Sequence, residues 1–389
     1  MAKARDDMHR TDVIALPMAS PGTQRSLTVH RWGEPGARPK VYIQAGLHAD
    51  ELPGVMTACQ LIPLLDSAQQ AGQILGEVIL LPCANPIGLS QSLHGVHHGR
   101  FSFVDGAGNF NRGWPDLGSM VLPLVDGKLG SDPDENIPVM RAALRDAVAS
   151  LPDLSERQAH QKALLSLSID ADFVFDLHCD AQALLHLFAN VEHEDLVMEL
   201  GCDMGAPVVM LESSIDAGLF DECNGRPWVK VRRAMGLSPD ALPAACFAPT
   251  IELRGQGDVS PALAAQDASN IMAFLRRRGM IGGTVPDLAK ALCDATPTEG
   301  CDMVLAPSAG MVVWHQPIGA TVERGDHLAD ILDLTAHDPL SSGVQVLSPQ
   351  TGVLFSHRLT YLTRPGDVLG QIAGATPLSD RQVGQFLNP

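Results

Sequence analysis

Short apolar runs alternate with stretches of helical periodicity between residues 40 and 280 of the chain. Continuous apolar runs of this length predict buried strands, here at residues 41–45, 78–82, 173–177, 208–211 and 250–253. Apolar positions with helical spacing predict helices at residues 54–65, 139–150, 155–169 and 261–278. Alternating strands and helices are typical of an α/β fold, in which helices flank a central sheet.

A long segment at residues 91–135 interrupts this alternation and is rich in Gly, Asp and Pro. Ligands of α/β sheets gather just beyond the carboxyl ends of the strands. Loops of this length in compact domains are often functional. We therefore expect residues 91–135 to cover that edge of the sheet.

The pattern changes near residue 280, where helical periodicity gives way to short β-like runs and turn glycines. The change predicts a large α/β domain at residues 1–283 and a linker with one short helix at residues 284–304. The remaining residues, 305–389, are expected to form a small all-β domain at the C-terminus.

The small all-β domain resembles a biotinyl/lipoyl-type sandwich made of two similar halves. The first half contains residues 307–310 and 319–326, and the same scheme returns at residues 349–354 and 364–369. Carrier function in such a domain needs a lysine, and no lysine follows Lys290. The domain therefore keeps at most the shape of a carrier, and we expect it to wall the active site or to build a homo-oligomer.

Composition and charge narrow the range of partners. With 389 residues, 45% of them hydrophobic, the chain is able to bury a sizeable core. Its formal net charge of −18 argues against nucleic acids and anionic membranes as partners, because both need a basic surface. No window approaches 18 uninterrupted apolar residues, so no transmembrane helix is expected.

Targeting and cysteine patterns bear on the compartment. The first residues run into no apolar signal-peptide core. Eight cysteines are scattered along the chain without a Cys-x-x-Cys pair, which predicts reduced, mostly buried thiols instead of a disulfide framework. Together these features favour a cytoplasmic location.

Candidate metal ligands follow two of the predicted strands. His48 and Glu51 come after the strand at residues 41–45, and His178 ends the strand at residues 173–177. Two imidazoles and one carboxylate leave a zinc ion one open position for water, which is typical of catalytic sites. Taken alone, His48 and Glu51 are better interpreted as an ordinary polar loop that opens a helix, and His178 as a strand-end histidine; the other motifs shift the balance to metal binding. Asp176 shares a strand face with His178 and either orients it or binds a nearby loop.

Four motifs occur in a fixed order along the chain, at residues 46–54, 109–115, 176–178 and 250–254. Together they resemble the succinylglutamate desuccinylase/aspartoacylase family of the zinc carboxypeptidase superfamily. The resemblance covers roughly residues 38–280, plus the small β-domain that this family carries at its C-terminus. It implies a zinc-carboxypeptidase-like mixed sheet.

The same resemblance implies one Zn²⁺ per chain, held by His48, Glu51 and His178. Two imidazoles and a carboxylate also suit Co²⁺ or Mn²⁺. Glu252 matches the family's general base, which takes a proton from the attacking water and passes it to the leaving amine. Arg100 matches the arginine that stabilises the oxyanion.

Substrate binding is assigned partly by the resemblance and partly by the residues themselves. Asn111 and Arg112 match the pair that grips a substrate carboxylate, which suits the bidentate guanidinium fork. Arg254 either touches substrate or pairs with an acid. Asp180 lies beside the metal ligands, and we expect it to favour a substrate with a cationic amine. Cys179 is not expected to act as a nucleophile, since metal-activated water supplies the attack.

A histidine cluster at His94, His97 and His98 has two interpretations. One is a second metal site, and the favoured one is a solvated or substrate-facing loop.

The leading functional prediction is a zinc-dependent amidohydrolase that cleaves a small N-acyl amino acid to a carboxylic acid and a free amino acid. A metallocarboxypeptidase acting on short or cell-wall peptides would use the same residues. A non-enzymatic metal-binding sensor or scaffold is the alternative from a different class, and it does not need the full set of catalytic residues found here.

Overall fold

The computed structural model describes residues 9–103, 106, 108–214 and 218–379. It divides the chain into two compact units. Unit 1 contains residues 1–178, 215–251 and 259–289, and unit 2 contains residues 179–214, 252–258 and 290–389. The interpretation of the first residues as lacking a signal peptide falls outside the described part of the chain.

Unit 1 is built on a mixed sheet with the strand order β1-β2-β4-β3-β9. β1 and β2 are antiparallel, β2 is antiparallel to β4, and β4, β3 and β9 run parallel. These strands are β1 (Arg10–Ala15), β2 (Ser26–Gly33), β3 (Lys40–Ala45), β4 (Glu77–Leu81) and β9 (Phe173–Asp180). The boundary between the units falls inside β9 and inside β13 (Thr250–Gly255). The predicted mixed α/β fold is therefore confirmed.

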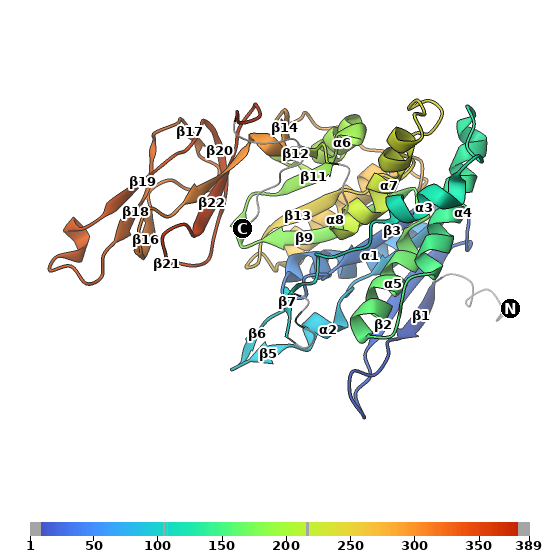
Figure 1. Cartoon of the computed structure of the whole chain (residues 1–389), viewed down its shortest axis with the longest axis horizontal. Helices are drawn as coiled ribbons and strands as arrows, with labels where there is room; N and C mark the ends of the chain where they lie inside the picture. The colour runs from blue at the N-terminus through green and yellow to red at the C-terminus, as the bar shows by residue number, and fades with distance from the viewer. Residues whose placement is uncertain (1–8, 104–105, 107, 215–217, 380–389) are drawn as a thin grey trace. The chain divides into compact units, whose positions relative to one another are not determined.

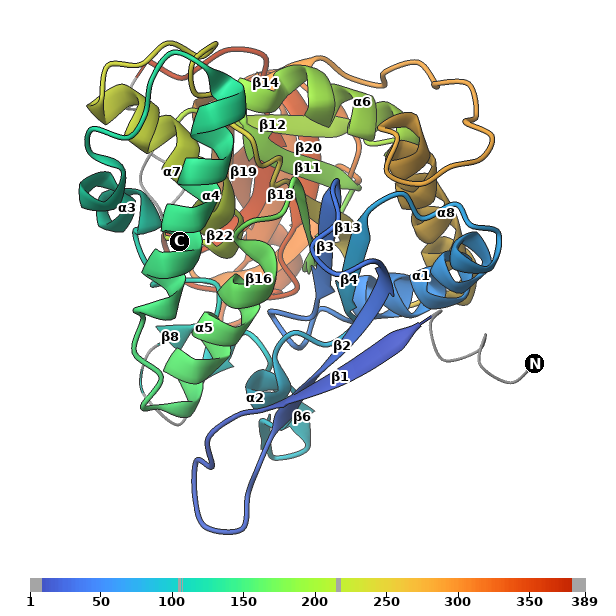
Figure 2. The same ribbon diagram turned by 90° about the vertical axis from the view of Figure 1, so that its right-hand side faces the viewer.

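Helices cover both faces of this sheet (Figure 2), with α1 and α8 on one face and α3, α4, α5 and α7 on the other. A large apolar core lies between the sheet and the second group, and includes Tyr42, Leu144 and Trp228. The helices of unit 1 are α1 (Leu52–Gln70), α2 (Pro86–Leu89), α3 (Leu117–Val125), α4 (Pro133–Ala149), α5 (Glu156–Ser168), α7 (Phe220–Ala234) and α8 (Pro261–Arg277).

Two sequence expectations for unit 1 need correction. Strand β9 continues to Asp180, so His178 lies inside the strand and does not follow its end. The strand continues through His178, whose two buried ring nitrogens face the carboxylates of Glu51 and Asp176 at 2.8 Å and 2.9 Å. The segment at residues 91–135 also contains regular structure: β5 (Ser92–Leu93), β6 (Val96–His97), β7 (Phe101–Ser102), β8 (Gly108–Asn109), α3 and the start of α4.

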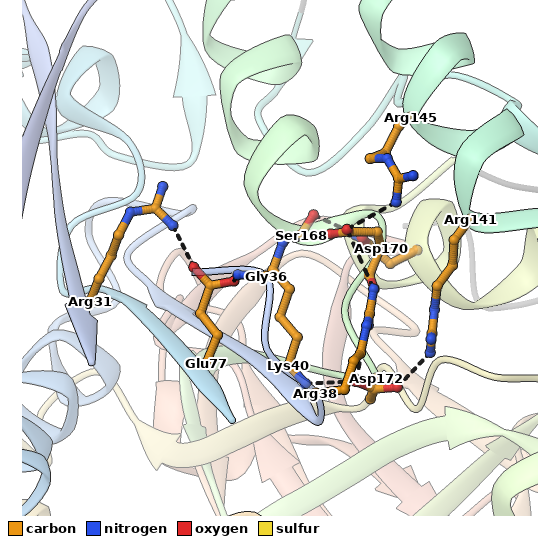
Figure 3. Close-up of polar contacts among 11 residues, drawn as sticks. Arg31, Gly36, Arg38, Lys40, Glu77, Arg141, Arg145, Ser168, Asp170 and Asp172 are labelled. Carbon is orange, nitrogen blue, oxygen red and sulfur yellow. Dashed lines mark hydrogen bonds and ion pairs between the residues drawn. The ribbon is translucent and has the colours of Figure 1, made fainter. Parts of the chain in front are cut away.

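An ion-pair network holds together the amino-terminal ends of β3 and β9 (Figure 3). Lys40 binds Asp170 through Nζ at 2.5 Å, and its backbone amide donates to Asp172 at 2.6 Å. Arg38 also pairs with Asp172, at 3.0 Å, and Arg141 approaches the other oxygen of the same carboxylate, at 2.5 Å. These bonds fix the register in which β3 lies against β9.

Unit 2 contains a parallel set of strands, in which β12 lies between β11 and β14, together with helix α6 (Figure 1). These elements are β11 (His186–Asn190), η1 (Val191–His193), α6 (Glu194–Met204), β12 (Val208–Glu212) and β14 (Ala295–Pro297). The segment predicted as a linker with a short helix contains β14 and the one-turn helix η2 (Thr298–Gly300).

Two antiparallel sheets make up the rest of unit 2. The first contains β10 (Gln182–Ala183), β15 (Cys301–Leu305), β17 (Thr321–Val322), β20 (Gly352–His357) and β22 (Val368–Ala373). The second contains β16 (Gly310–Trp314), β18 (His327–Leu332), β19 (Val344–Leu347) and β21 (Leu362–Thr363), and η3 (Pro339–Ser341) precedes β19. Both sheets contribute to one apolar core, for example Leu354 from the first and Leu328 from the second.

The two halves of this β region share a turn, as the repeated sequence suggests. Each half has a two-residue strand, then a turn with a glycine at positive φ, then a six-residue strand. The glycines are Gly325 (φ 95°) and Gly366 (φ 86°). The carboxylates of Asp326 and Asp367 each accept the backbone amide hydrogen of the residue three positions earlier, at 2.8 Å.

Two further expectations concern the whole chain. Within residues 9–379, apart from the gaps named above, no helix is long and apolar enough to cross a membrane. All eight cysteines are free thiols.

Candidate metal centre

Three side chains from separate parts of unit 1 converge at the carboxyl-terminal end of β3. His48 follows β3, Glu51 immediately precedes α1, and His178 lies on β9. The Nδ1 atoms of the two histidines lie 2.9 Å and 2.8 Å from the two carboxylate oxygens of Glu51. All three residues are buried, and one ligand atom from each lies within 4.8 Å of the others. The structure thus brings together the three predicted metal ligands.

The outer ring nitrogens of both histidines are held by oxygen atoms. His48 Nε2 lies 2.7 Å from Asn109 Oδ1, and His178 Nε2 lies 2.9 Å from Asp176 Oδ2. Asn109 Oδ1 accepts a hydrogen bond from His48 Nε2, which favours the tautomer that leaves the Nδ1 lone pair facing Glu51. At His178 the Asp176 carboxylate lies at ion-pair distance from Nε2, outside hydrogen-bond geometry. A lone pair and a carboxylate oxygen attract each other only when a proton or a cation lies between them. The donor set therefore fits a metal ion.

Electrostatics in this buried cluster favour charge separation. Desolvation acts to raise the pKa of Glu51, but His48 and His178 outweigh it and hold that pKa well below its usual value. Desolvation also acts to lower the pKa of His178, and here Asp176 and then Glu51 outweigh it, so the pKa of His178 is raised. For His48, desolvation prevails and lowers the pKa. Glu51 is thus held as the anion that a metal ligand must be.

A chain of hydrogen bonds supports His178 from behind. Tyr42 donates its hydroxyl to Gln44 Oε1 at 2.7 Å, and Gln44 Nε2 donates to Asp176 Oδ1 at 3.0 Å. Gln44 and Asp176 are directly paired in the register of β3 and β9. Asp176 thus orients His178, which is one of the two roles left open by the sequence. Gln44 was not predicted; its signal was a polar residue inside an otherwise apolar strand.

Gly54 allows α1 to approach β9 closely between the ligands. A Cβ atom at this position would lie 2.8 Å from the carbonyl oxygen of Leu177 and 3.0 Å from its Cβ. Helix α1 begins directly after Glu51, and Leu177 directly precedes His178. The absent side chain of Gly54 therefore sets how near the carboxylate comes to the second imidazole.

Arg100 reaches the same cluster from the segment between β6 and β7. Its Nη2 donates to Glu51 Oε1 at 2.5 Å, and its side chain is 33% exposed, so a ligand can reach it. The preceding Gly99 lies directly on the segment before Glu51, where a Cβ would be 2.1 Å from the Asp50 nitrogen. Gly99 also accepts a hydrogen bond from the Ala49 amide at 3.1 Å. The unusual glycine-rich context of Arg100 is thus explained by close backbone packing.

The predicted carboxylate-binding pair lies on the segment that also supplies Asn109. Asn111 is buried, and its Oδ1 accepts the amide hydrogen of Phe220 at the start of α7, at 2.9 Å. Arg112 is exposed, and its Nη1 donates to the Asn111 carbonyl at 2.8 Å. The pKa of Arg112 is lowered, chiefly by desolvation; Glu222 acts to raise this pKa and Arg100 acts to lower it. The guanidinium groups of Arg112 and Arg100 are therefore within electrostatic reach of each other.

Arg157 of α5 holds this segment in place and was not predicted from the sequence. Its Nη2 donates to the carbonyl oxygens of Asn109 and Arg112 at 2.9 Å and 3.2 Å. Its guanidinium also lies 5.3 Å from the centre of the Phe110 ring. No local sequence pattern announces such a contact between a helix and a loop 45 residues earlier.

The remaining predicted site residues belong to unit 2. Glu252 and Arg254 lie on β13, and Arg254 has a φ of 66°, which non-glycine residues rarely adopt. Asp180 accepts the amide hydrogen of Ala181 at 2.7 Å and pairs with Arg358 at 3.4 Å. The Asp180 carboxylate already has a cationic partner in its own unit. Its role in selecting a cationic substrate stays a prediction, as do the roles of Glu252 and Arg254.

The histidine cluster at residues 94–98 does not form a metal-binding group among the described residues. His97 Nε2 lies 3.2 Å from the Gly88 carbonyl oxygen, and the His98 ring packs against Phe103 at 5.3 Å. These contacts agree with the favoured interpretation as a loop.

Comparison with known proteins supports the resemblance drawn from the motifs. A family model described as the succinylglutamate desuccinylase/aspartoacylase catalytic domain matches residues 37–120. A solved structure of a protein assigned to the same family, from Shewanella amazonensis SB2B, has 27% sequence identity and a TM-score of 0.81. The match covers 94% of this chain and 98% of that one. The predicted resemblance to this family is confirmed.

More distant structures share the fold. A protein of the same description from Shewanella frigidimarina NCIMB 400 has 22% identity and a TM-score of 0.82, over 95% of this chain and 98% of its own. The ectoine utilization protein EutE (DoeB) from Ruegeria pomeroyi has 18% identity and a TM-score of 0.63, over 95% and 96%. At these identities the likeness shows the fold alone. No curated protein gives a significant sequence match.

Proposed function

We propose that this chain is a zinc-dependent amidohydrolase that cleaves the amide bond of a small N-acyl amino acid. The family it resembles is one of deacylases, which are hydrolases. The observation that carries the proposal is the convergence of His48, Glu51 and His178, with an oxygen atom within 3 Å of the outer nitrogen of each imidazole. This is the arrangement of a three-ligand catalytic metal site.

The spacing of the donor atoms suits a tetrahedral ion. Bonds of ~2.0–2.2 Å at tetrahedral angles separate ligand atoms by roughly 3.3–3.6 Å. The two nitrogen–oxygen separations of 2.8 and 2.9 Å therefore need to widen by less than an ångström. When bound there, zinc would lower the pKa of water from ~15.7 towards ~7 and polarise a substrate carbonyl.

The chain's own residues supply the other parts of the reaction. Arg100, at the cluster and one third exposed, carries the planar set of N–H donors that stabilises a developing oxyanion. Glu252, assigned by the resemblance, takes a proton from the attacking water and gives it to the leaving amine. The products are a carboxylic acid and a free amino acid.

Substrate binding is assigned to Arg112, with Asn111 as its support. Arg112 is exposed and lies in electrostatic reach of Arg100, so two guanidinium groups attract a carboxylate-bearing substrate within a chain of net charge −18. Asn111 fixes the backbone of this segment through its bond to α7. We also assign substrate contacts to Arg254 and Asp180, on the sequence argument alone.

We further propose that residues 305–389 are a small biotinyl/lipoyl-like domain, joined by residues 284–304 to a catalytic domain of residues 1–283. The shared core of the two antiparallel sheets supports a sandwich. Without a lysine after Lys290, such a domain has no carrier chemistry.

The decisive experiment measures release of free amine from a panel of N-acyl amino acids, with zinc-loaded and chelator-treated protein side by side. Zinc-dependent release from one member supports the deacylase. Silence across the panel, with zinc bound, refutes it and favours the peptidase.

A single substitution tests the assigned base. Glu252→Gln is expected to bind zinc like the wild type and to lose nearly all turnover, whereas the control Glu323→Gln, exposed in the β region, keeps its activity. Substantial turnover in Glu252→Gln would overturn the base assignment.

A further inference from the structure

A second group of metal-binding side chains lies in unit 2, among the strands of the β region. His315 Nε2 and His327 Nε2 each lie 2.8 Å from Asp330, one on each carboxylate oxygen. The two imidazole rings are tilted by 54°, with their centres 4.7 Å apart. One nitrogen or oxygen from each residue lies within 4.8 Å of the others. None of the three takes part in the candidate metal centre of unit 1.

The pairing of β16 with β18 accounts for this convergence. Trp314, the last residue of β16, pairs with Ala329 of β18, and the amide of the next residue, His315, donates to the Leu328 carbonyl at 2.8 Å. His315 is thereby fixed beside β18 by the main chain. The contact of its side chain with Asp330 is therefore supported by main-chain hydrogen bonding to β18.

A β-bulge brings the other two residues to the same side of the strand. In regular strand geometry, residues three positions apart point to opposite faces. His327 and Asp330 are three apart, yet they are bonded, because the register of β18 against β19 shifts between His327 and Ala329. A bulge of this kind reverses the alternation and re-aims a side chain. The backbone irregularity therefore has a specific result, a cluster of three donors.

We propose that His315, His327 and Asp330 bind a divalent transition-metal ion, with Zn²⁺ as the test ion. Two imidazoles and a carboxylate are ligands that zinc, nickel and copper accept, and no thiolate is needed. The 2.8 Å separations would open to roughly 3.3–3.6 Å around an ion with bonds of ~2.0–2.2 Å. The side chains of the two histidines are 44% and 37% exposed, so the ion reaches the site directly and keeps water in its remaining positions.

Zinc binding by the metal-free full-length chain tests the proposal. Isothermal titration at pH 7.5 is expected to give two equivalents for the wild type and one for the double variant His315→Gln/His327→Gln. The matched control His337→Gln changes an exposed histidine of the same region and is expected to keep both equivalents. Equal stoichiometry in the wild type and the double variant would overturn the proposal, whereas a fall from one equivalent to none would support this site and count against the centre in unit 1.

A second measurement needs no substitution and so does not depend on how a variant folds. Diethyl pyrocarbonate modifies accessible imidazoles, and mass spectrometry locates the modified residues. Added zinc is expected to slow modification of His315 and His327 at least fivefold while His337 is modified at an unchanged rate. Equal rates with and without zinc at all three histidines would refute the site.

Discussion

Gly54 provides the most specific test of how the fold builds the metal centre. In Gly54→Ala the new Cβ would lie 2.8 Å from the Leu177 carbonyl oxygen, against the 3.4 Å at which ordinary contact begins. The obstructing atom is backbone, which cannot turn aside. Helix α1 must therefore move away from β9 by about 0.6 Å, and Glu51 moves with the start of the helix.

Two opposing effects set the expected stability of this variant. Overpacking costs ~1–3 kcal/mol, and the replacement of glycine by alanine in a helix returns up to ~1 kcal/mol. We expect a net loss of roughly 1–2 kcal/mol in the free energy of unfolding. Zinc affinity should also fall, by about 10–100-fold. A displaced Glu51 carboxylate should bind zinc as weakly as a ligand that has lost the residue that orients it.

Gly225 supplies the matched control, since it also lies in a helix, α7, of unit 1. A Cβ there would meet the nearest atom, Ala248 Cβ, at 3.6 Å, which is ordinary contact. Gly225→Ala should therefore be up to ~1 kcal/mol more stable than the wild type, with unchanged zinc affinity.

Urea unfolding of the metal-free proteins and zinc competition with a chromogenic chelator measure the two quantities. If Gly54→Ala behaves like Gly225→Ala in both, the contact with Leu177 does not determine the position of Glu51, and the account of the metal centre given above is wrong.

Three further predictions concern residues around the centre. His160 is buried, its Nε2 donates to the Ala84 carbonyl oxygen at 2.6 Å, and burial lowers its pKa from 6.5 to about 4. As the pH falls from 7 to 4, the His160 imidazole binds a proton in the unfolded chain before it does so in the folded protein. This difference should lower the free energy of unfolding by up to ~3 kcal/mol. Urea unfolding should show this contribution in the wild type and not in His160→Gln. Asn109→Ala and Asp176→Asn should each weaken zinc binding by about 10–100-fold in chelator competition. Wild-type affinity in either variant would show that the replaced residue does not orient its histidine. Arg157→Lys should raise KM severalfold and leave zinc affinity unchanged, because it loosens the segment that carries the carboxylate-binding pair; a wild-type KM would exclude that role.

The central strands were predictable because they are buried on both faces and therefore appear as continuous apolar runs. The peripheral strands were not, because β1 is largely exposed and β2 alternates between buried and exposed positions. Helix α7 was missed for another reason. Its buried face includes Arg226 and Arg232, so the inward positions do not show up as a periodic pattern of apolar residues. Such burial is decided by tertiary partners that the local sequence does not reveal.

The metal ligands were predictable because two of the four motifs, at residues 46–54 and 176–178, contain them. Among the residues beside those ligands, Asp176 was predicted to orient His178 as one of two roles, whereas Asn109 and Gln44 were given no role, although Asn109 lies within one of the motifs. An orienting residue is defined by the atom it contacts, and that atom lies 61 residues away in the case of His48 and Asn109. Gln44 likewise acts on a residue of another strand, Asp176, 132 positions later. The pairing of Gln44 with Asp176 follows from the sheet register, and the contact of His48 with Asn109 from the path of the segment before α3; neither follows from a local pattern.

The register itself depends on charges at the opposite end of the sheet. At the amino-terminal ends of β3 and β9, Lys40 is bonded to Asp172 and to Asp170 (Figure 3). Four residues further along β3, Gln44 is paired with Asp176, and Asp176 in turn holds His178. A slip of one residue between these strands would put the wrong face of β9 towards the site. The ion pairs remote from the metal centre therefore support it, by fixing which side chain of β9 stands opposite Gln44.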